Sequence, residues 1–170
     1  MFERVRTLAG KSIRLFDQLI ATTTPTSGAI ELVHTMLTNG TKCYLVSGGF
    51  YVITGPVAAL WGFHDHRANH RHVRDSKILG KVQTPVLNPN AKAGYLEHYC
   101  KQNGIDPIDA ATIGDGANNL AMLQAAGMGV ALEGKPLLLT KMAIQLDHTD
   151  LRGLLYIQGY KKHDFIASEI

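Results

Sequence analysis

Apolar residues recur along this chain at two spacings, one typical of buried strands and the other of amphipathic helices. Short, mostly apolar runs predict strands at residues 42–46, 110–114, 127–132 and 144–146. Apolar positions that repeat every three or four residues predict helices at residues 2–19, 29–37, 50–61, 91–102, 118–126, 136–142 and 150–160. Because strands and helices alternate, the sequence predicts an α/β fold with a parallel sheet.

The stretch between residues 64 and 82 predicts a β-hairpin. Asp75-Ser76-Lys77 has the composition of a turn, and the residues on both sides suit extended arms. If the first arm is extended, one face carries four histidines, His64, His66, His70 and His72. A histidine-rich metal site is one interpretation. A solvated, partly titrating surface is the preferred one, because no cysteine or suitably placed carboxylate completes a ligand set.

Composition narrows the class of protein without identifying it. A chain of 170 residues with 45% hydrophobic and 18% charged residues is typical of one soluble globular domain. The net charge of +3 is too small and too scattered to indicate nucleic-acid binding. Two cysteines without metal-ligand spacing favour a reducing, cytoplasmic location.

Two segments allow a targeting or membrane interpretation. The basic N-terminus loosely resembles a transit peptide, but Glu3 and Asp17 interrupt it, so we expect an ordinary amphipathic helix. The uncharged run at residues 43–63 is long enough to span a bilayer. Since Ser47-Gly48-Gly49 breaks its most apolar part, we instead expect a buried strand, a turn and a helix, and no membrane association.

A carboxylate stands at the end of one predicted strand, in Gly114-Asp115-Gly116. Open α/β folds bind ligands at the carboxyl ends of their strands, and flanking glycines let backbone approach the ligand. The spacing does not match the dinucleotide-binding fingerprint, because the third glycine is missing. Asp115 suits a hard cation such as Mg²⁺. The alternative is that Asp-Gly merely forms the turn between strand and helix.

A second predicted strand ends in Ser47-Gly48-Gly49, which offers a hydroxyl and the N–H groups expected to begin a helix. Such an arrangement binds phosphate or carboxylate oxygens. Lys92 lies in the first turn of its predicted helix, where a cation opposes the helix dipole, and Asn118 offers an amide. Together with Asp115 these groups favour phosphoryl transfer. Taken singly, each suits a tight turn, a helix cap or a solvated lysine.

In this order the motifs identify a family. Val46-Ser47-Gly48-Gly49-Phe50, Asn90-Ala91-Lys92 and the stretch from Gly114 to Leu120 closely resemble phosphoserine phosphatases of the haloacid dehalogenase superfamily. The resemblance runs from about Phe2 to Phe165. It implies a Rossmann-like core with a small helical cap that uses Mg²⁺ to hydrolyse phosphoserine in serine biosynthesis. We accordingly expect a cap remnant at residues 1–24, the core at 25–165 and a loose tail at 166–170, with the whole stretch from Lys161 onwards loosely held.

The resemblance also implies roles for individual residues. Ser47 and the Gly48 N–H would bind the phosphoryl oxygens. Lys92 would neutralise the phosphate and the nucleophile. Asp115 would hold Mg²⁺, and Asn118 would support the polar network on the substrate side.

Arg4 matches the cap arginine that receives the substrate carboxylate, for which a bidentate guanidinium is well suited. At position 119 this chain departs from the family. Asn119 stands where the family has an aspartate, so a charge that would orient Lys92 and the water shell of the metal is missing.

A second departure concerns the nucleophile. The family carries it in an Asp-x-Asp-x-Thr/Ser motif on a central strand, and these 170 residues contain no match to that motif. We therefore expect a sheet without its central strand, a chain without hydrolytic activity as it stands, or a second chain that supplies the strand. The alternatives are a non-catalytic module that binds phosphate or phosphoserine, and a hydrolase of another phosphomonoester.

Overall fold

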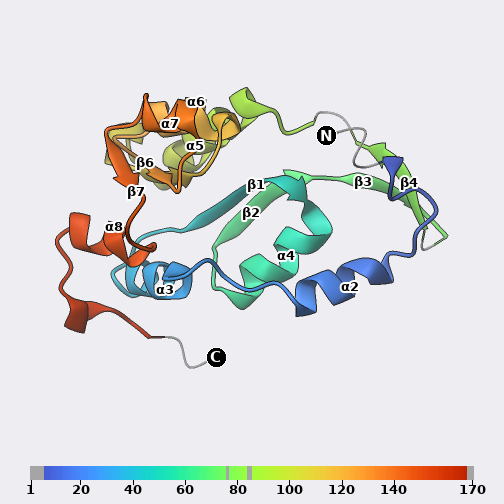
Figure 1. The fold of residues 1–170 in the computed structure, drawn as a ribbon, viewed down its shortest axis with the longest axis horizontal. Helices are drawn as coiled ribbons and strands as arrows, with labels where there is room; N and C mark the ends of the chain where they lie inside the picture. The colour runs from blue at the N-terminus through green and yellow to red at the C-terminus, as the bar shows by residue number, and fades with distance from the viewer. Residues whose placement is uncertain (1–5, 76, 84–85, 168–170) are drawn as a thin grey trace. The chain divides into compact units, whose positions relative to one another are not determined.

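The computed structural model describes residues 6–75, 77–83 and 86–167, and it has an α/β fold with parallel strands and helices (Figure 1). The chain forms two compact units. Unit 1 comprises Met1–Pro25 and Met36–Leu87, and unit 2 comprises Thr26–Thr35 and Asn88–Ile170. Among the described residues, no helix is long and apolar enough to cross a membrane.

Unit 1 is built on two parallel strands, β1 (Tyr44–Phe50) and β2 (Asp65–Asn69), which are connected by helix α4 (Tyr51–Leu60) (Figure 1). Helix α4 packs against both strands, and helix α2 (Arg14–Ala21) packs against α4. An antiparallel hairpin of β3 (Arg71–Arg74) and β4 (Lys77–Val82) follows. The buried apolar side chains of the unit include Phe16, Val57, Ala58, Ala68, Ile78 and Val82.

The predicted hairpin is present, but it is shorter than expected. Its first arm begins at Arg71, because residues 65–69 pair with β1 in the parallel sheet instead. The predicted helix at residues 2–19 is also shorter, and its first four residues, 2–5, lie outside the described ones. Gly10 has a left-handed backbone (φ 77°), and its N–H donates to the carbonyl of Ile78, so the chain leaves helical geometry to meet β4. Helix α2 therefore begins only at Arg14.

Unit 2 contains three parallel strands in the order β5 (Ala111–Gly114), β6 (Met128–Leu132) and β7 (Ile144–Leu146). Helices α6 (Leu120–Ala125) and α7 (Pro136–Leu139) connect them, and α5 (Pro89–Asn103) packs against α6. The core of the unit includes Leu96, Cys100, Met122, Leu123, Ala131 and Leu138. The predicted alternation of strand and helix is confirmed here, with shifted helix ends.

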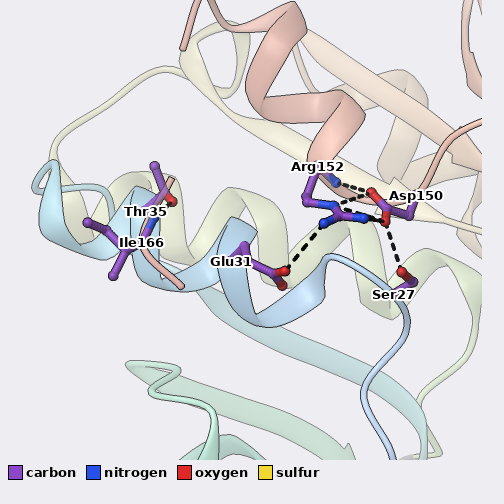
Figure 2. Close-up of polar contacts among 6 residues, drawn as sticks. All are labelled: Ser27, Glu31, Thr35, Asp150, Arg152 and Ile166. Carbon is purple, nitrogen blue, oxygen red and sulfur yellow. Dashed lines mark hydrogen bonds and ion pairs between the residues drawn. The ribbon is translucent and has the colours of Figure 1, made fainter. Parts of the chain in front are cut away.

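Helix α3 (Ala29–Thr38) begins in unit 2, where polar contacts fasten its first turns to helix α8 (Arg152–Ile157) (Figure 2). The hydroxyl of Ser27 donates a hydrogen bond to the carboxylate of Asp150 (2.8 Å). The same carboxylate also pairs with Arg152. Arg152 reaches Glu31 at 3.7 Å. We call these four residues the Asp150 cluster. The side chain of Ser27 thus bonds to a residue 123 positions away in the sequence.

The expectation of a loose chain from Lys161 onwards stays a prediction; the described residues of this segment are exposed apart from Phe165, yet they make specific hydrogen bonds. Residues 162–164 form a turn of 3₁₀-helix, in which Asp164 accepts a hydrogen bond from the N–H of Lys161. The N–H of Ile166 then donates to the buried hydroxyl of Thr35 at 2.9 Å (Figure 2). This bond connects the segment to α3, because the N–H of Ile166 finds its acceptor in the side chain of Thr35. Residues 168–170 lie outside the described part.

The boundary between the two units at Pro25 and Thr26 lies next to the predicted division at residue 24, and whether that division separates a cap from a core stays a prediction. Residues before it group with β1, β2 and the hairpin, because the backbone around Gly10 pairs with β4. Among the described residues, β1 pairs only with β2, and β5 only with β6, so the two parallel sheets are separate. The expectation that a larger sheet lacks its central strand in this sequence stays a prediction.

Candidate functional site

Ser47, Gly48 and Gly49 lie in unit 1 at the carboxyl end of β1, where the strand bulges away from its partner. The register with β2 runs from Tyr44 to Val46 and resumes only at Phe50, so three residues of β1 oppose one of β2. Bulges of this kind redirect side chains and backbone groups near functional sites. A Cβ atom added at Gly48 would meet no atom within 4 Å, which leaves space beside this backbone.

The bulge differs from the expected helix start. The strand continues to Phe50, and α4 begins at Tyr51. The N–H of Gly49 donates to Ser47 Oγ at 3.0 Å, so the prediction that this N–H is free for a ligand is wrong. The cause is the short side chain of Ser47, which turns back onto the backbone two residues later.

The bulge is held in place by Asn69, a residue that the sequence motifs did not indicate. Its side chain is only 2% exposed, and its Nδ2 donates to the carbonyls of Gly48 (2.9 Å) and Gly49 (3.3 Å). Its Oδ1 accepts from the N–H of Leu87 at 2.6 Å. Because every partner is a backbone group about 20 residues away, no local pattern in the sequence marks this asparagine.

In unit 2, Asp115 follows β5 directly and is exposed at the end of the strand. The preceding residue, Gly114, has to be a glycine. A Cβ atom there would lie 2.5 Å from Cβ of Asn119, which is shorter than any normal contact between two carbon atoms. The chain then forms a 3₁₀ turn, η2 (Ala117–Asn119), and continues into α6. Within this turn Asn118 is exposed, whereas Asn119 is only 5% exposed.

A polar chain connects Lys92 to Asp115 through Asn119. Lys92 is 6% exposed on α5, and its Nζ donates to Asn119 Oδ1 at 2.5 Å. Asn119 Nδ2 donates in turn to Asp115 Oδ1 at 3.1 Å. Lysine can only donate, which fixes the orientation of the Asn119 amide. Burial lowers the pKa of Lys92, and the charge of Asp115 opposes this shift in part.

The predicted site residues therefore fall into three groups. Ser47 and Gly48 lie in unit 1, at the bulge of β1. Lys92 and Asp115 are brought together in unit 2, with Asn118 in the adjoining turn. Arg4 lies outside the described residues.

Three of the four histidines contact other residues of unit 1. Nδ1 of His64 accepts from the N–H of Cys43 at 3.2 Å, and His66 bonds to the hydroxyl of Thr54 at 3.0 Å. The ring of His70 stacks on Tyr51 at 4.4 Å. Among the described residues, no group of three or more histidine, cysteine, aspartate or glutamate side chains is placed to hold a metal ion.

Comparison with known proteins identifies the family. The model of the haloacid dehalogenase-like hydrolases matches residues 2–124. Phosphoserine phosphatase of Methanocaldococcus jannaschii is 35% identical over 153 residues, covering 90% of this chain and 72% of that protein. The phosphoserine phosphatase of Streptococcus thermophilus is 34% identical over 155 residues, covering 91% of this chain and 72% of that protein. A substrate-bound phosphoserine phosphatase structure matches at 35% identity with a TM-score of 0.87, covering 92% of this chain and 74% of the other. The chain belongs to the haloacid dehalogenase-like hydrolase family.

Proposed function

We propose that this chain is the phosphate- and metal-binding part of a phosphoserine phosphatase, a phosphoric monoester hydrolase that acts on O-phosphoserine. The polar chain of unit 2 carries the proposal, because it sets a buried lysine beside an exposed carboxylate at a strand end. Sequence similarity to phosphoserine phosphatases supports the same substrate. The reaction belongs to serine biosynthesis, and the expected location is the cytoplasm.

In this proposal, Ser47 and the N–H of Gly48 bind phosphoryl oxygens, for which the open space at Gly48 leaves room. Lys92 neutralises charge on the phosphate and the nucleophile, and Asn119 fixes its ammonium group. Asn118 supports polar contacts on the substrate side. In this assignment the substrate carboxylate is received by Arg4.

Asp115 suits Mg²⁺ as a donor, because Mg²⁺ takes one or two carboxylates and completes its shell with water and phosphate oxygens. One oxygen of Asp115 accepts from Asn119, and the exposed carboxylate offers its other oxygen. When bound, the ion would neutralise phosphate charge. The amide of Asn119 adds no charge to the site, so we expect weaker metal binding than an aspartate there would give.

We propose further that these 170 residues bind phosphoserine without hydrolysing it. They contain no Asp-x-Asp-x-Thr/Ser motif, and such a motif supplies the nucleophilic aspartate. Among the residues that the structure describes, β1 pairs only with β2 and β5 only with β6, which favours a strand from outside this sequence, carried by a second chain or a preceding segment. A purely phosphate-binding module is the second candidate function, favoured by the same missing motif.

Calorimetric titration with O-phosphoserine and MgCl₂ tests the proposal, with phosphate release measured in parallel. We expect saturable binding, no turnover, and at least about tenfold weaker binding in both Ser47→Ala and Lys92→Met. Lys101→Met is the matched control, because Lys101 is exposed at the far end of the same helix. Binding that neither substitution weakens would contradict the proposed site. Magnesium-dependent turnover lost in Asp115→Ala would contradict the proposed inactivity.

Fusing a segment with Asp-x-Asp-x-Thr ahead of this sequence separates the two candidates. Turnover that requires the first aspartate of that segment supports the phosphatase. Unchanged binding without turnover supports the module. Replacing phosphoserine by other phosphomonoesters in the same assay tests the remaining alternative, a different substrate.

A further inference from the structure

The hydroxyl of Ser47 accepts a hydrogen bond and keeps its own hydrogen for a ligand. Its oxygen accepts from the N–H of Gly49 at 3.0 Å, and among the residues that the structure describes the hydroxyl donates to no acceptor. A Cβ atom at Gly49 would lie only 3.1 Å from this oxygen, so a glycine suits the close approach. Because successive hydrogen bonds polarise one another, a hydroxyl that already accepts one bond becomes a better donor.

The N–H that bonds to Ser47 belongs to a peptide group that Asn69 holds from the other side. In a trans peptide group the N–H and the C=O point in opposite directions, so the carbonyl of Gly48 and the N–H of Gly49 move as one rigid unit. Asn69 Nδ2 donates to that carbonyl at 2.9 Å, and Ser47 Oγ accepts from that N–H at 3.0 Å. The orientation of this peptide group is therefore fixed at both ends.

The side-chain amide of Asn69 is itself held in one orientation. Its Oδ1 accepts from the N–H of Leu87 at 2.6 Å, and its Nδ2 donates to the carbonyls of Gly48 and, at 3.3 Å, Gly49. A flipped amide would set its oxygen against two carbonyl oxygens, which have no hydrogen to donate. Since the residue is only 2% exposed, a lost partner is costly to leave unreplaced.

We propose that Asn69 is a positioning residue for phosphate binding. By orienting the peptide group between Gly48 and Gly49, it directs the N–H of Gly49 to Ser47 Oγ, and the Ser47 hydroxyl then donates its hydrogen to a phosphoryl oxygen. This inference rests on the proposed function and adds to it a residue that does not touch the ligand. Without the Asn69 amide the peptide group rotates, Ser47 loses the bond from Gly49, and its hydroxyl takes other orientations.

Calorimetric titration with inorganic phosphate tests the proposal on Asn69→Ala and Ser47→Ala, singly and combined. Alanine removes the amide without introducing a charge that would itself repel phosphate. We expect Asn69→Ala to bind phosphate at least about tenfold more weakly than the intact chain. In the Ser47→Ala background the same change should weaken binding by no more than about twofold, because the hydroxyl through which Asn69 acts is already absent.

Asn103→Ala is the matched control. Asn103 also donates from Nδ2 to a backbone carbonyl, that of Tyr99, at 2.7 Å, but it lies in unit 2. Its replacement should leave the phosphate affinity within about twofold. An unchanged affinity in Asn69→Ala would overturn the inference. Equal weakening by Asn69→Ala with and without the Ser47 hydroxyl would overturn it too, because Asn69 would then act on the fold in general.

Hydrogen exchange of the Asn69 side-chain amide, followed by NMR in the intact chain, decides the question even if Asn69→Ala does not fold. Coupling between two sites is reciprocal, so if Asn69 strengthens phosphate binding, bound phosphate must strengthen the hydrogen bonds of Asn69. We expect saturating phosphate to slow this exchange. Exchange at an unchanged rate would overturn the inference.

The proposed function fails in a different way. If the intact chain binds no inorganic phosphate, the phosphate site at Ser47 and Gly48 is wrong. Exchange of the Gly49 N–H without ligand then decides the role of Asn69. Faster exchange in Asn69→Ala than in both the intact chain and Asn103→Ala supports the orienting role, and equal rates overturn it.

Discussion

Replacing Asp150 by asparagine tests how the first turns of α3 are held in unit 2. The carboxylate accepts hydrogen bonds from Ser27 Oγ, from the backbone N–H of Arg152 and from its guanidinium (Figure 2). The hydrogen bonds and charge of Arg152, with a smaller contribution from Ser27, lower the pKa of Asp150 from 3.8 to about 2. The substitution keeps the size of the side chain and removes its charge.

The magnitude follows from this pKa. A fall from 3.8 to about 2 corresponds to at most about 2.5 kcal/mol of stability at neutral pH. The side chain of Asp150 is 18% exposed and that of Arg152 is 47% exposed, so solvent screens the interaction. The asparagine oxygen also keeps part of the hydrogen bonding. We therefore expect Asp150→Asn to lose roughly 1 kcal/mol, a decrease of about 0.5 M in the urea midpoint.

The direction of the pKa shift determines at which pH the stabilisation by Asp150 is present. The pKa is lower in the folded state, so the contribution is fully present above about pH 3.8 and is lost as the pH falls through about 2. Urea unfolding followed by circular dichroism should show a constant difference between the two proteins from pH 7 to 5, and a shrinking one below pH 4. Asp147→Asn, an exposed residue outside the Asp150 cluster, is the control. A difference that persists at pH 2, or a control with an equal loss, would refute this reasoning.

Three further predictions concern other parts of the molecule. Asn119→Asp adds a carboxylate beside Asp115, and we expect Mg²⁺ binding measured by calorimetry to tighten about tenfold; unchanged binding would contradict this. Burial raises the pKa of Cys43 to about 11, so its alkylation rate, followed by mass spectrometry, should still rise between pH 9 and 10; a plateau near pH 9 would contradict the burial. Thr35→Val leaves the N–H of Ile166 without its acceptor, and we expect a loss of about 1 kcal/mol in urea unfolding together with faster hydrogen exchange at that amide. Unchanged exchange there would show that the bond does not hold the segment.

Much of the fold was predictable, because local periodicity encodes it. The strands ending at Gly114 and Leu146 lie where short apolar runs predict them, and glycines mark the strand ends in both units. The interruption of the first predicted helix was not predictable. Its apolar spacing continues through Gly10, and only the pairing of this backbone with β4 explains the break.

The candidate site, too, was predictable from the sequence only in part. The motifs around Ser47, Lys92 and Asp115 indicate phosphoryl chemistry in the sequence itself, because residue types and short spacings determine which groups reach a strand end.

The tertiary structure decided which partners these groups have. It set Asn119 between Lys92 and Asp115 and bonded Asn69 to the bulge. The physical reason is distance along the chain. Asn119 is 27 residues from Lys92, and Asn69 is 21 from Gly48, so packing alone brings them together and no local pattern encodes their hydrogen bonds.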